Sequence, residues 1–507
     1  MASGDILAFG PFQLDTRTKR LSRDGEPVVL GARQIDLLCL LVSRAGQVLS
    51  KDLLIEAAWR DVAVTDNSLE QAISSLRRSL TAAAGPQYIE TLARRGYRFS
   101  AEVTRLDRRE TDEALDALLA PHRAWIEGRA ALETLEHDQI VHARSVFEGV
   151  LRHVPDQASA HVGLANACAM QFEMTRSDPV PDAGTLATAL HHATEACKLD
   201  AQYGEAWATL GFVLDRTGNR ADALAASRRA VALEGDNWRH HLRLAYASWG
   251  EERLREARRT LALLPGFPLA HWLAASVHVA RQALSEAERD LVAGLAVQDR
   301  QPGTRSRFSG VALHWLLGLI HLARGDESRA LGEFEHELSY EGSGHLYARE
   351  CCANTWYAIG ALKLRQGEIG AAQAAFQHAM SRVSMHPLAR IGLAAVSTRA
   401  STRASTMVGR PVSGVDETFP LVADLPATAP AGQLDAPSVL VDRAVSRAVQ
   451  LVLAGAPTDA ARTVEQALAE AAPGSAGWLL PVEPMLRALA DPALWGPALA
   501  RVRNRAA

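Results

Sequence analysis

The sequence is poor in cysteine, in lysine and in long apolar runs. Its five cysteines are odd in number and scattered, and none forms a CxxC motif, so neither a disulfide framework nor a zinc or redox motif is predicted. They lie in apolar helical patterns and are expected to be small core residues in a reducing compartment. Only four of the 54 basic residues are lysine, which reflects genomic base composition and weakens any inference from arginine abundance.

Signals for membrane insertion or export are also missing. The longest nearly apolar run, residues 311–323, is about 13 residues long, whereas a spanning helix needs about 20. The N-terminal "MASGDILAFG" lacks a charged region followed by an apolar one, so no signal peptide is indicated. A cytoplasmic protein with no membrane partner is expected.

Enzyme signatures are absent too. No GxxxxGK[ST], strand-linked GxGxxG, GxSxG or kinase motif set occurs. The histidine pairs 271/278 and 314/321 are seven residues apart, whereas a metal pair on one helix prefers a spacing of four. The sequence therefore predicts no enzyme, no cofactor and no metal site.

Length and charge distribution indicate several domains. A chain of 507 residues with 48% hydrophobic and 22% charged residues is an ordinary globular composition, too long for one core. Residues 1–105 carry 14 Lys+Arg against 12 Asp+Glu, and the remainder carries 40 against 46. A mildly basic head on an acidic body permits a nucleic-acid contact without requiring one.

The first hundred residues change period in a fixed order. "FGPFQLDTRTKRLSRDGEPVVLG" alternates as short antiparallel strands do, and "ARQIDLLCLLVSRAG" then has helical spacing and ends at Gly46. Ser50 can cap a second helix, "KDLLIEAAW", and Asp66 or Asn67 can cap a third, "TDNSLEQAISSLRRSL". "QYIETLARRGYRFSAEV" reads as strand, basic turn and strand. The order predicts an α+β domain of sheet, three helices and hairpin.

That order resembles the OmpR/PhoB-type winged-helix DNA-binding domain over about residues 6–104. The resemblance rests on three motifs, "LGARQIDLLCLLVSRAGQVLSKDLLIEAAW", "DNSLEQAISSLRRSL" and "IETLARRGYRF". The last two motifs are close to those of CadC/ToxR-like one-component regulators. The resemblance implies double-stranded promoter DNA as a partner. Two departures follow: no receiver domain precedes the motifs in this sequence, and no transmembrane segment is seen.

In this family the third helix enters the major groove, where Arg, Asn and Gln discriminate bases. Leu69, Ile73, Leu76 and Leu80 are then expected to face the core. The candidate base or groove-wall contacts are Asn67, Ser68, Gln71, Ser74, Ser75 and Arg78, with Arg77 as a phosphate contact. The family usually has basic residues at the Ser74-Ser75 positions, which implies a different target sequence. The alternative is an amphipathic core helix with a solvated face.

The hairpin turn is expected to be a basic wing tip. Arg94 and Arg95 precede Gly96, and arginine is attracted to narrow minor grooves. By resemblance, Tyr97 and Trp59 are candidate phosphate contacts. Core packing of these two aromatic residues is an equally good interpretation.

From about Pro121 the chain shows the 34-residue period of tetratricopeptide (TPR) repeats. Small residues at fixed offsets let paired helices approach, and an aromatic residue fills the space between neighbours. The matching sets are Trp207, Leu210, Gly211, Ala223 and Ala230; Ala143, Phe147, Val150 and Pro155; Gly318, Ala330 and Phe334; and Trp356, Gly360, Ala372, Phe376 and Ala379. The sequence resembles an all-α TPR-like superhelical solenoid following the winged helix.

Four domains are predicted: a winged helix (1–106), TPR-like repeats (107–396), a flexible linker (397–437), and a divergent C-terminal repeat or cap (438–507). Repeat register places polar and aromatic side chains on a concave groove suited to a peptide, a partner helix or an apolar ligand. The residues predicted to face this groove are Asn166, Phe212, Tyr246, Trp249, Trp315 and Tyr357. The alternative is burial of the aromatics between degenerate helices.

Together these features favour a sequence-specific transcription regulator whose solenoid binds an effector or partner, or self-associates. RNA polymerase or another protein is an expected partner, and a homodimer is plausible. The alternative function is a TPR scaffold whose winged helix mediates protein–protein contact.

Overall fold

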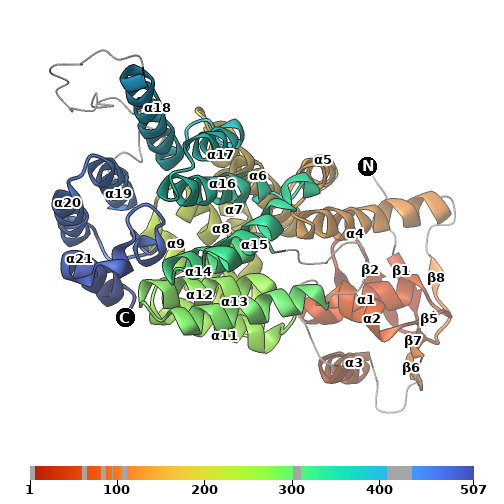
Figure 1. Cartoon of the computed structure of the whole chain (residues 1–507). Coiled ribbons are helices and arrows are strands. Elements are labelled where there is room, and N and C mark those ends of the chain that lie inside the picture. The colour runs from red at the N-terminus through yellow and green to blue at the C-terminus, as the bar shows by residue number, and fades with distance from the viewer. Residues whose placement is uncertain are drawn as a thin grey trace. The chain divides into compact units, whose positions relative to one another are not determined.

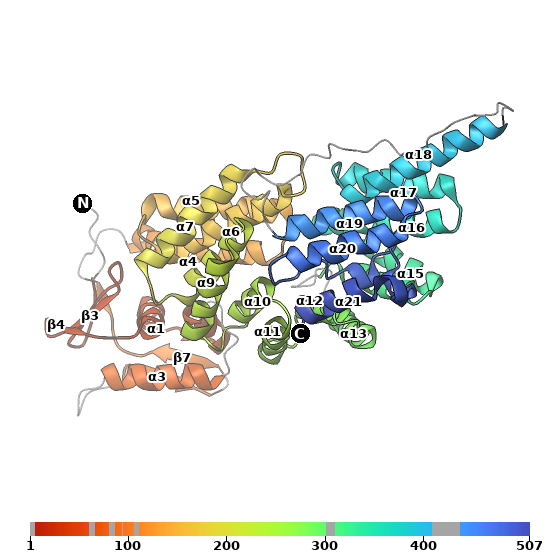
Figure 2. The same cartoon turned by 90° about the vertical axis from the view of Figure 1, so that its left-hand side faces the viewer.

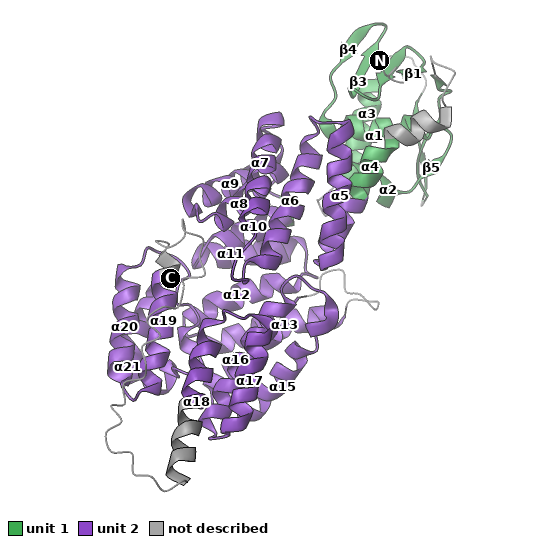
Figure 3. Cartoon of the chain, turned by 90° about the horizontal axis from the view of Figure 1, so that it is seen from above, with its two compact units in different colours: residues 1–126, 236–238 green, residues 127–235, 239–507 purple. Residues whose placement is uncertain are grey.

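A computed structural model describes residues 6–59, 66–80, 87–93, 95–105, 111–300, 310–407 and 437–507. The chain forms two compact units, coloured separately in Figure 3. Unit 1 comprises residues 1–126 with 236–238, and unit 2 comprises residues 127–235 with 239–507. The four domain boundaries predicted above remain predictions. One helix, α4 (Thr111–Glu133), runs from unit 1 into unit 2.

Unit 1 contains two antiparallel sheets among its described residues, labelled in Figures 1 and 2. The first has the order β4-β3-β2-β1-β8 and the second the order β5-β7-β6. Alternation places Leu7, Phe9, Phe12 and Leu14 on the buried face of the first sheet. The strands are β1 (Ile6–Phe9), β2 (Phe12–Asp15), β3 (Arg20–Arg23), β4 (Glu26–Val28), β5 (Val48–Leu49), β6 (Ile89–Leu92), β7 (Gly96–Phe99) and β8 (Thr104–Arg105).

Three helices, α1 (Ala32–Ser43), α2 (Lys51–Ala58) and α3 (Asp66–Leu80), cover these sheets. The Ser50 hydroxyl accepts a hydrogen bond from the Leu53 backbone N–H (3.3 Å), so the predicted cap of the second helix is confirmed. Phe9 packs edge-on against Phe99, with ring centroids 5.0 Å apart, at the centre of the core. The predicted sheet, three helices and hairpin are thereby confirmed.

Unit 2 is a succession of helices in which consecutive members pack as pairs (Figure 1). They are α5 (His137–His153), α6 (Ala158–Thr175), α7 (Ala183–Leu199), α8 (Gly204–Arg216), α9 (Arg220–Leu233), α10 (Trp238–Ala247), α11 (Glu251–Leu263), α12 (Pro268–Ala280), α13 (Leu284–Asp299), α14 (Leu313–Ala323), α15 (Glu327–Leu338), α16 (Ala348–Arg365), α17 (Ile369–Arg382), α18 (Pro387–Met407), α19 (Pro437–Leu453), α20 (Pro457–Glu470) and α21 (Pro492–Arg505).

The small residues of the repeat motif do what their spacing predicts. A Cβ on Gly318 would overlap the Phe334 ring, and a Cβ on Gly360 would overlap the Phe376 ring. Both phenylalanines are fully buried. Each glycine therefore lets the second helix of its repeat approach closely, while the ring fills the gap. The TPR-like solenoid predicted from these positions is confirmed.

Two distant parts of the solenoid meet in a clasp, defined here as the contacts of residues 135–137 and 173–178 with residues 344–350. The Arg176 guanidinium pairs with Glu350, and Arg349 pairs with Asp178 at 2.6 Å. The Leu346 N–H donates to the Leu135 carbonyl at 2.7 Å. Residues separated by more than a third of the chain thus lie side by side.

The C-terminal helices pack on the middle of the solenoid. Val464 and Trp495 share an apolar cluster with Leu273 and Val277 of α12, and α21 lies beside α12 in Figures 1 and 2. The Arg281 guanidinium donates to the Ala506 carbonyl (2.7 Å) and the Gln282 amide to the Leu499 carbonyl (2.8 Å). Helix α18 runs past residue 397, where the linker was predicted to begin. None of the helices among the described residues has the length and apolarity needed to cross a bilayer.

Candidate functional site

Helix α3 has one buried and one free face. Leu69, Ile73, Leu76 and Leu80 are at most 1% exposed, as the apolar spacing predicts. On the opposite side Asn67, Gln71, Ser74 and Arg78 are all exposed, at spacings of four, three and four residues. Such spacing aligns side chains along one stripe of a helix. We call these four residues the α3 stripe.

The side chains of the α3 stripe are free of partners within the described part of the chain. All four make no hydrogen bond or ion pair to any other residue that the structure describes. Arg78 is therefore an exposed cation that no described carboxylate neutralises. Asn and Gln supply paired donors and acceptors, so the stripe offers the groups that read base edges in a major groove.

Ser75 and Arg77, by contrast, are engaged in packing α3 against the domain. The Ser75 hydroxyl accepts from the Gln34 side-chain amide of α1 at 2.8 Å. The Arg77 guanidinium donates to the Ile89 carbonyl (3.0 Å) and to the Thr91 hydroxyl (2.7 Å) of β6. Arg77 also lies over the Tyr97 ring at 5.9 Å. The arginine predicted to contact phosphate thus positions the helix relative to the hairpin. Ser68 is half-buried beside the stripe.

Two carboxylates near α3 and the hairpin are paired with cations. Glu70 accepts from Lys51 of α2 at 3.0 Å, and Glu90 of β6 accepts from Arg98 of β7 at 2.6 Å. Exposed pairs of this kind contribute little stability. The ion pairs do reduce the negative charge beside the stripe, where an unpaired carboxylate would repel a phosphate backbone.

The hairpin turn is built around Gly96. Its φ is +123°, and a Cβ there would overlap the Leu49 carbonyl, so no other residue fits the turn. Arg95, exposed, precedes it and donates its backbone N–H to the Leu92 carbonyl at 3.0 Å. Arg94, the other predicted wing-tip residue, lies outside the described residues. A single described arginine therefore stands exposed at this turn.

The two aromatic candidates lie in the core. Tyr97 is 3% exposed and Trp59 is 6% exposed. Both belong to the apolar cluster of unit 1, and Arg33 lies over the Trp59 ring at 6.0 Å. Their positions favour the packing interpretation over a phosphate contact.

In unit 2, the predicted groove residues fall into two groups. Asn166 and Phe212 lie within a charged network: the Asn166 carbonyl accepts from Arg243 at 2.6 Å, and its amide donates to Thr209 at 3.1 Å. Arg216 and Arg243 both lie over the Phe212 ring, at 4.7 and 5.0 Å. Arg243, on α10, also belongs to this network. It was not identified from the sequence, because the repeat pattern is weak in this helix.

Two of the other four residues, Trp315 and Tyr357, lie against residues 474–490, which we call the strap. It joins α20 to α21 and contains two short 3-10 turns, at Leu480–Val482 and Ala488–Ala490. Trp315 shares an apolar cluster with Val482 of the strap, and Tyr357 donates its hydroxyl hydrogen to Glu483. Tyr246 and Trp249 pack against the cluster that holds Leu480 and Leu486. The strap therefore covers two of the residues predicted to line a groove.

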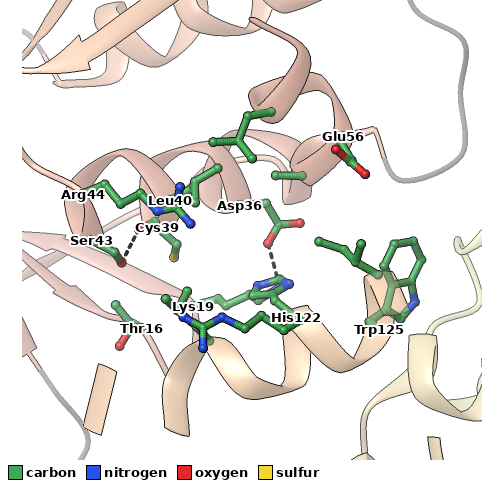
Figure 4. Close-up of a pocket in the computed structure, with 15 residues that line it drawn as sticks. Thr16, Lys19, Asp36, Cys39, Leu40, Ser43, Arg44, Glu56, His122 and Trp125 are labelled. Atoms are coloured by element: carbon green, nitrogen blue, oxygen red, sulfur yellow. Dashed lines mark hydrogen bonds and ion pairs between the residues drawn. The ribbon is translucent and has the colours of Figure 1, made fainter. Parts of the chain in front are cut away.

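Unit 1 also holds a small cavity of about 130 Å³, shown in Figure 4. Helix α1 contributes Cys39 and Leu40 to its wall, and α4 contributes His122 and Trp125. Burial raises the pKa of the Cys39 thiol to about 12, which makes that thiol a poor nucleophile at neutral pH. The lining residues are Thr16, Lys19, Asp36, Cys39, Leu40, Ser43, Arg44, Leu53, Glu56, Ala57, Leu119, His122, Arg123, Trp125 and Ile126.

The described residues contain no group of three or more His, Cys, Asp or Glu side chains arranged to hold a metal ion. Two described histidines, His161 and His192, lie with their Nδ1 atoms 2.9 Å apart. Burial and the neighbouring His161 lower the pKa of His192 to about 4.

Comparison with known proteins concerns the N-terminal part most directly. Residues 25–99 match the family model described as "Transcriptional regulatory protein, C terminal". The chain is 33% identical over 112 residues to the transcriptional activator CadC of Escherichia coli strain K12, covering 22% of each protein. The chain thus spans about a fifth of the length of this curated relative.

Two solved structures resemble separate parts of the chain. The DNA-binding domain of E. coli CadC is 34% identical and covers 20% of this chain and 99% of that one, with a TM-score of 0.19. The human IFIT1 dimer with m7Gppp-AAAA is 14% identical and covers 69% of this chain and 72% of that one, with a TM-score of 0.46.

Proposed function

We propose that the chain, whose N-terminal part is a winged-helix DNA-binding domain of the OmpR/PhoB type, is a sequence-specific regulator of transcription. The observation that carries this proposal is the α3 stripe. A helix with one fully buried face presents four exposed polar side chains that have no internal partner, beside a hairpin that exposes Arg95. The stripe enters the major groove of promoter DNA, and the hairpin tip lies against the backbone or the minor groove.

Specificity and positioning are divided among the side chains of α3. Gln71 and Arg78 read base edges, because their planar donor groups form bidentate pairs with purines. Asn67 and Ser74 contribute adjacent groove contacts. Arg77, which is tied to β6, keeps the helix and the hairpin in a fixed relation and supplies charge near a phosphate.

The solenoid supplies the regulatory input. Its repeats offer an interior lined by aromatic and charged side chains, where a protein or peptide effector binds or a second copy associates. An effector that prefers the DNA-competent arrangement shifts the population toward it. RNA polymerase or another protein is the proposed partner, a homodimer on tandem half-sites is the proposed assembly, and the cytoplasm is the proposed location.

The test is selection of bound sequences from random double-stranded DNA, using the full chain and single variants. Gln71→Ala and Arg78→Ala should each relax the preference at particular positions, by about 1–3 kcal/mol per base pair. Arg20→Ala is the matched control, because it removes an exposed arginine from β3 of the same unit.

Salt dependence provides the second measurement. A protein that neutralises several phosphates loses orders of magnitude in affinity between about 50 and 200 mM salt. If the full chain selects no sequence, or if its DNA affinity is insensitive to salt, the proposal fails and a protein-scaffold role gains support.

A further inference from the structure

The strap is unusual among the connections of unit 2. Its sequence, "GSAGWLLPVEPMLRALA", joins two helices without forming a helix longer than a single 3-10 turn. Most connections between paired helices are only a few residues long, and a long irregular one usually has a function of its own. The strap lies on α12, α14 and α16, which are the first helices of their repeats.

Its apolar side chains occupy the groove as those of a bound peptide do. Trp478 packs edge-on against Trp272 of α12, with ring centroids 5.8 Å apart and an interplanar angle of 84°. Leu480 is 1% exposed and Val482 is 2% exposed. Pro481 lies between these two residues and Pro484 follows them, and proline limits the backbone to extended or turn geometry. The groove thus receives an aromatic residue followed by alternate aliphatic residues.

The strap also buries a carboxylate that forms no ion pair with any residue the structure describes. One Glu483 oxygen accepts from the Tyr357 hydroxyl, and the other accepts from the Leu486 backbone N–H at 2.6 Å. Glu483 forms no ion pair with any described residue, although its side chain is almost wholly enclosed. Burying a carboxylate that is held by neutral donors alone costs free energy, so Glu483 does not stabilise the fold as an ion pair would.

We propose that the strap is a built-in occupant of a peptide-binding groove, and that the groove binds in trans a peptide with an aromatic–aliphatic run followed by a carboxylate, in the turn-containing conformation of the strap. The Tyr357 hydroxyl is the subsite for that carboxylate, and Trp272 is the subsite for the aromatic residue. This inference rests on the effector role proposed for the solenoid and names its partner class. Because the strap is covalently attached, it competes at an effective concentration on the order of millimolar.

The experiment uses a fluorescein-labelled peptide of residues 476–489 and a full-length variant whose residues 475–490 are replaced by a Gly/Ser sequence of equal length. The peptide should bind the strap-replaced chain with a dissociation constant in the micromolar range. It should bind the intact chain on the order of 100-fold more weakly, because the strap fills the site. Trp272→Ala in the strap-replaced chain should weaken binding by about 10-fold or more, whereas Val292→Ala, at an exposed position on α13, should change nothing.

The carboxylate subsite is tested by pairing changes in the peptide and the groove. Tyr357→Phe should weaken the parent peptide several-fold but leave unchanged a peptide in which glutamate is replaced by alanine. If the strap-replaced chain keeps its helical circular dichroism but binds no peptide, the strap is a structural cover and the inference is wrong.

If the strap-replaced chain unfolds, native-state hydrogen exchange of the intact chain tests instead whether the strap can leave the groove. The Leu486 amide should exchange through local opening, at least 100-fold faster than amides in the α16–α17 pair. Exchange at the same rate as those amides would show the strap to be permanent core and would overturn the inference. DNA binding of the same variants is measured separately. If peptide binding is absent while DNA binding is intact, the peptide-groove inference is wrong and the proposed DNA-binding function is unaffected.

Discussion

Replacing Glu483 with glutamine measures the cost of burying the strap carboxylate. Glu483 is 6% exposed, and burial raises its pKa from 4.5 to about 7. Because the folded chain holds this proton more tightly than the unfolded chain, unit 2 gains stability from it below pH 4.5. That contribution is lost as the pH rises from 4.5 through about 7. One pKa unit is worth about 1.4 kcal/mol, so the loss at pH 8 is about 3 kcal/mol.

Glutamine preserves the contacts while removing the titration. Its carbonyl can accept from the Leu486 N–H, and its amide can donate to the Tyr357 oxygen. The variant should therefore be about 3 kcal/mol more stable than the parent at pH 8 and nearly equal to it at pH 4.5.

The assay is urea unfolding of both proteins between pH 5 and pH 8, compared as a difference at each pH. Burial lowers the pKa of His386 to about 4, so its contribution changes in the opposite sense, being lost as the pH falls from 6.5 through 4. That term is common to both proteins and cancels in the difference. Glu470→Gln, at an exposed site on α20, should change stability by less than about 0.5 kcal/mol. Parallel pH profiles for Glu483→Gln and the parent would show that burial of Glu483 does not make the stability of unit 2 depend on pH.

Three further substitutions test the fold and the interface. Ser50→Ala removes the cap of α2 and should lower the free energy of unfolding of unit 1 by about 1 kcal/mol in urea titrations, whereas Ser50→Thr should retain most of it. Phe376→Ala should cost about 3–5 kcal/mol, because the ring fills space beside Gly360 and Gly392; Phe376→Leu should cost clearly less, and an equal loss would contradict the packing argument. Arg77→Ala should destabilise unit 1 by about 1–3 kcal/mol and weaken every DNA site alike in fluorescence anisotropy, so a change in sequence preference would contradict its positioning role.

Local patterns in the sequence were sufficient for much of the fold. The spacing of Leu69 and Ile73 predicts the buried face of α3, since helical periodicity alone decides which side chains share a face. Gly360 and Phe376 predict a close helix pair, because their separation is fixed by the repeat itself. Ser50 predicts a cap from a hydrogen bond three residues away. Each of these inferences depends on contacts within one repeat or one helical turn.

The functional assignment of single side chains was harder to predict, because it depends on contacts between distant segments. Arg77 and Arg78 are adjacent polar residues of one helix, and periodicity alone does not show that Arg77 donates hydrogen bonds to β6. The groove positions of Trp315 and Tyr357 follow from repeat register, whereas their cover by the strap does not. Glu483 lies 126 residues beyond Tyr357, in a stretch with no period that could place it. Such contacts follow from the curvature of the solenoid as a whole.

The clasp between α6 and α16 changes how unit 2 is expected to lose its structure. An open array of repeats frays from its ends, because each repeat touches only its neighbours. Here Arg176 and Glu350, 174 residues apart, join the two sides of a loop of repeats, so opening one side exposes a second interface as well. The helices between them should melt together in a single transition and fold slowly, as chains with distant contacts do. Inserting or deleting one repeat between them would move Arg176 and Glu350 out of register, which fixes the number of repeats that this stretch can contain.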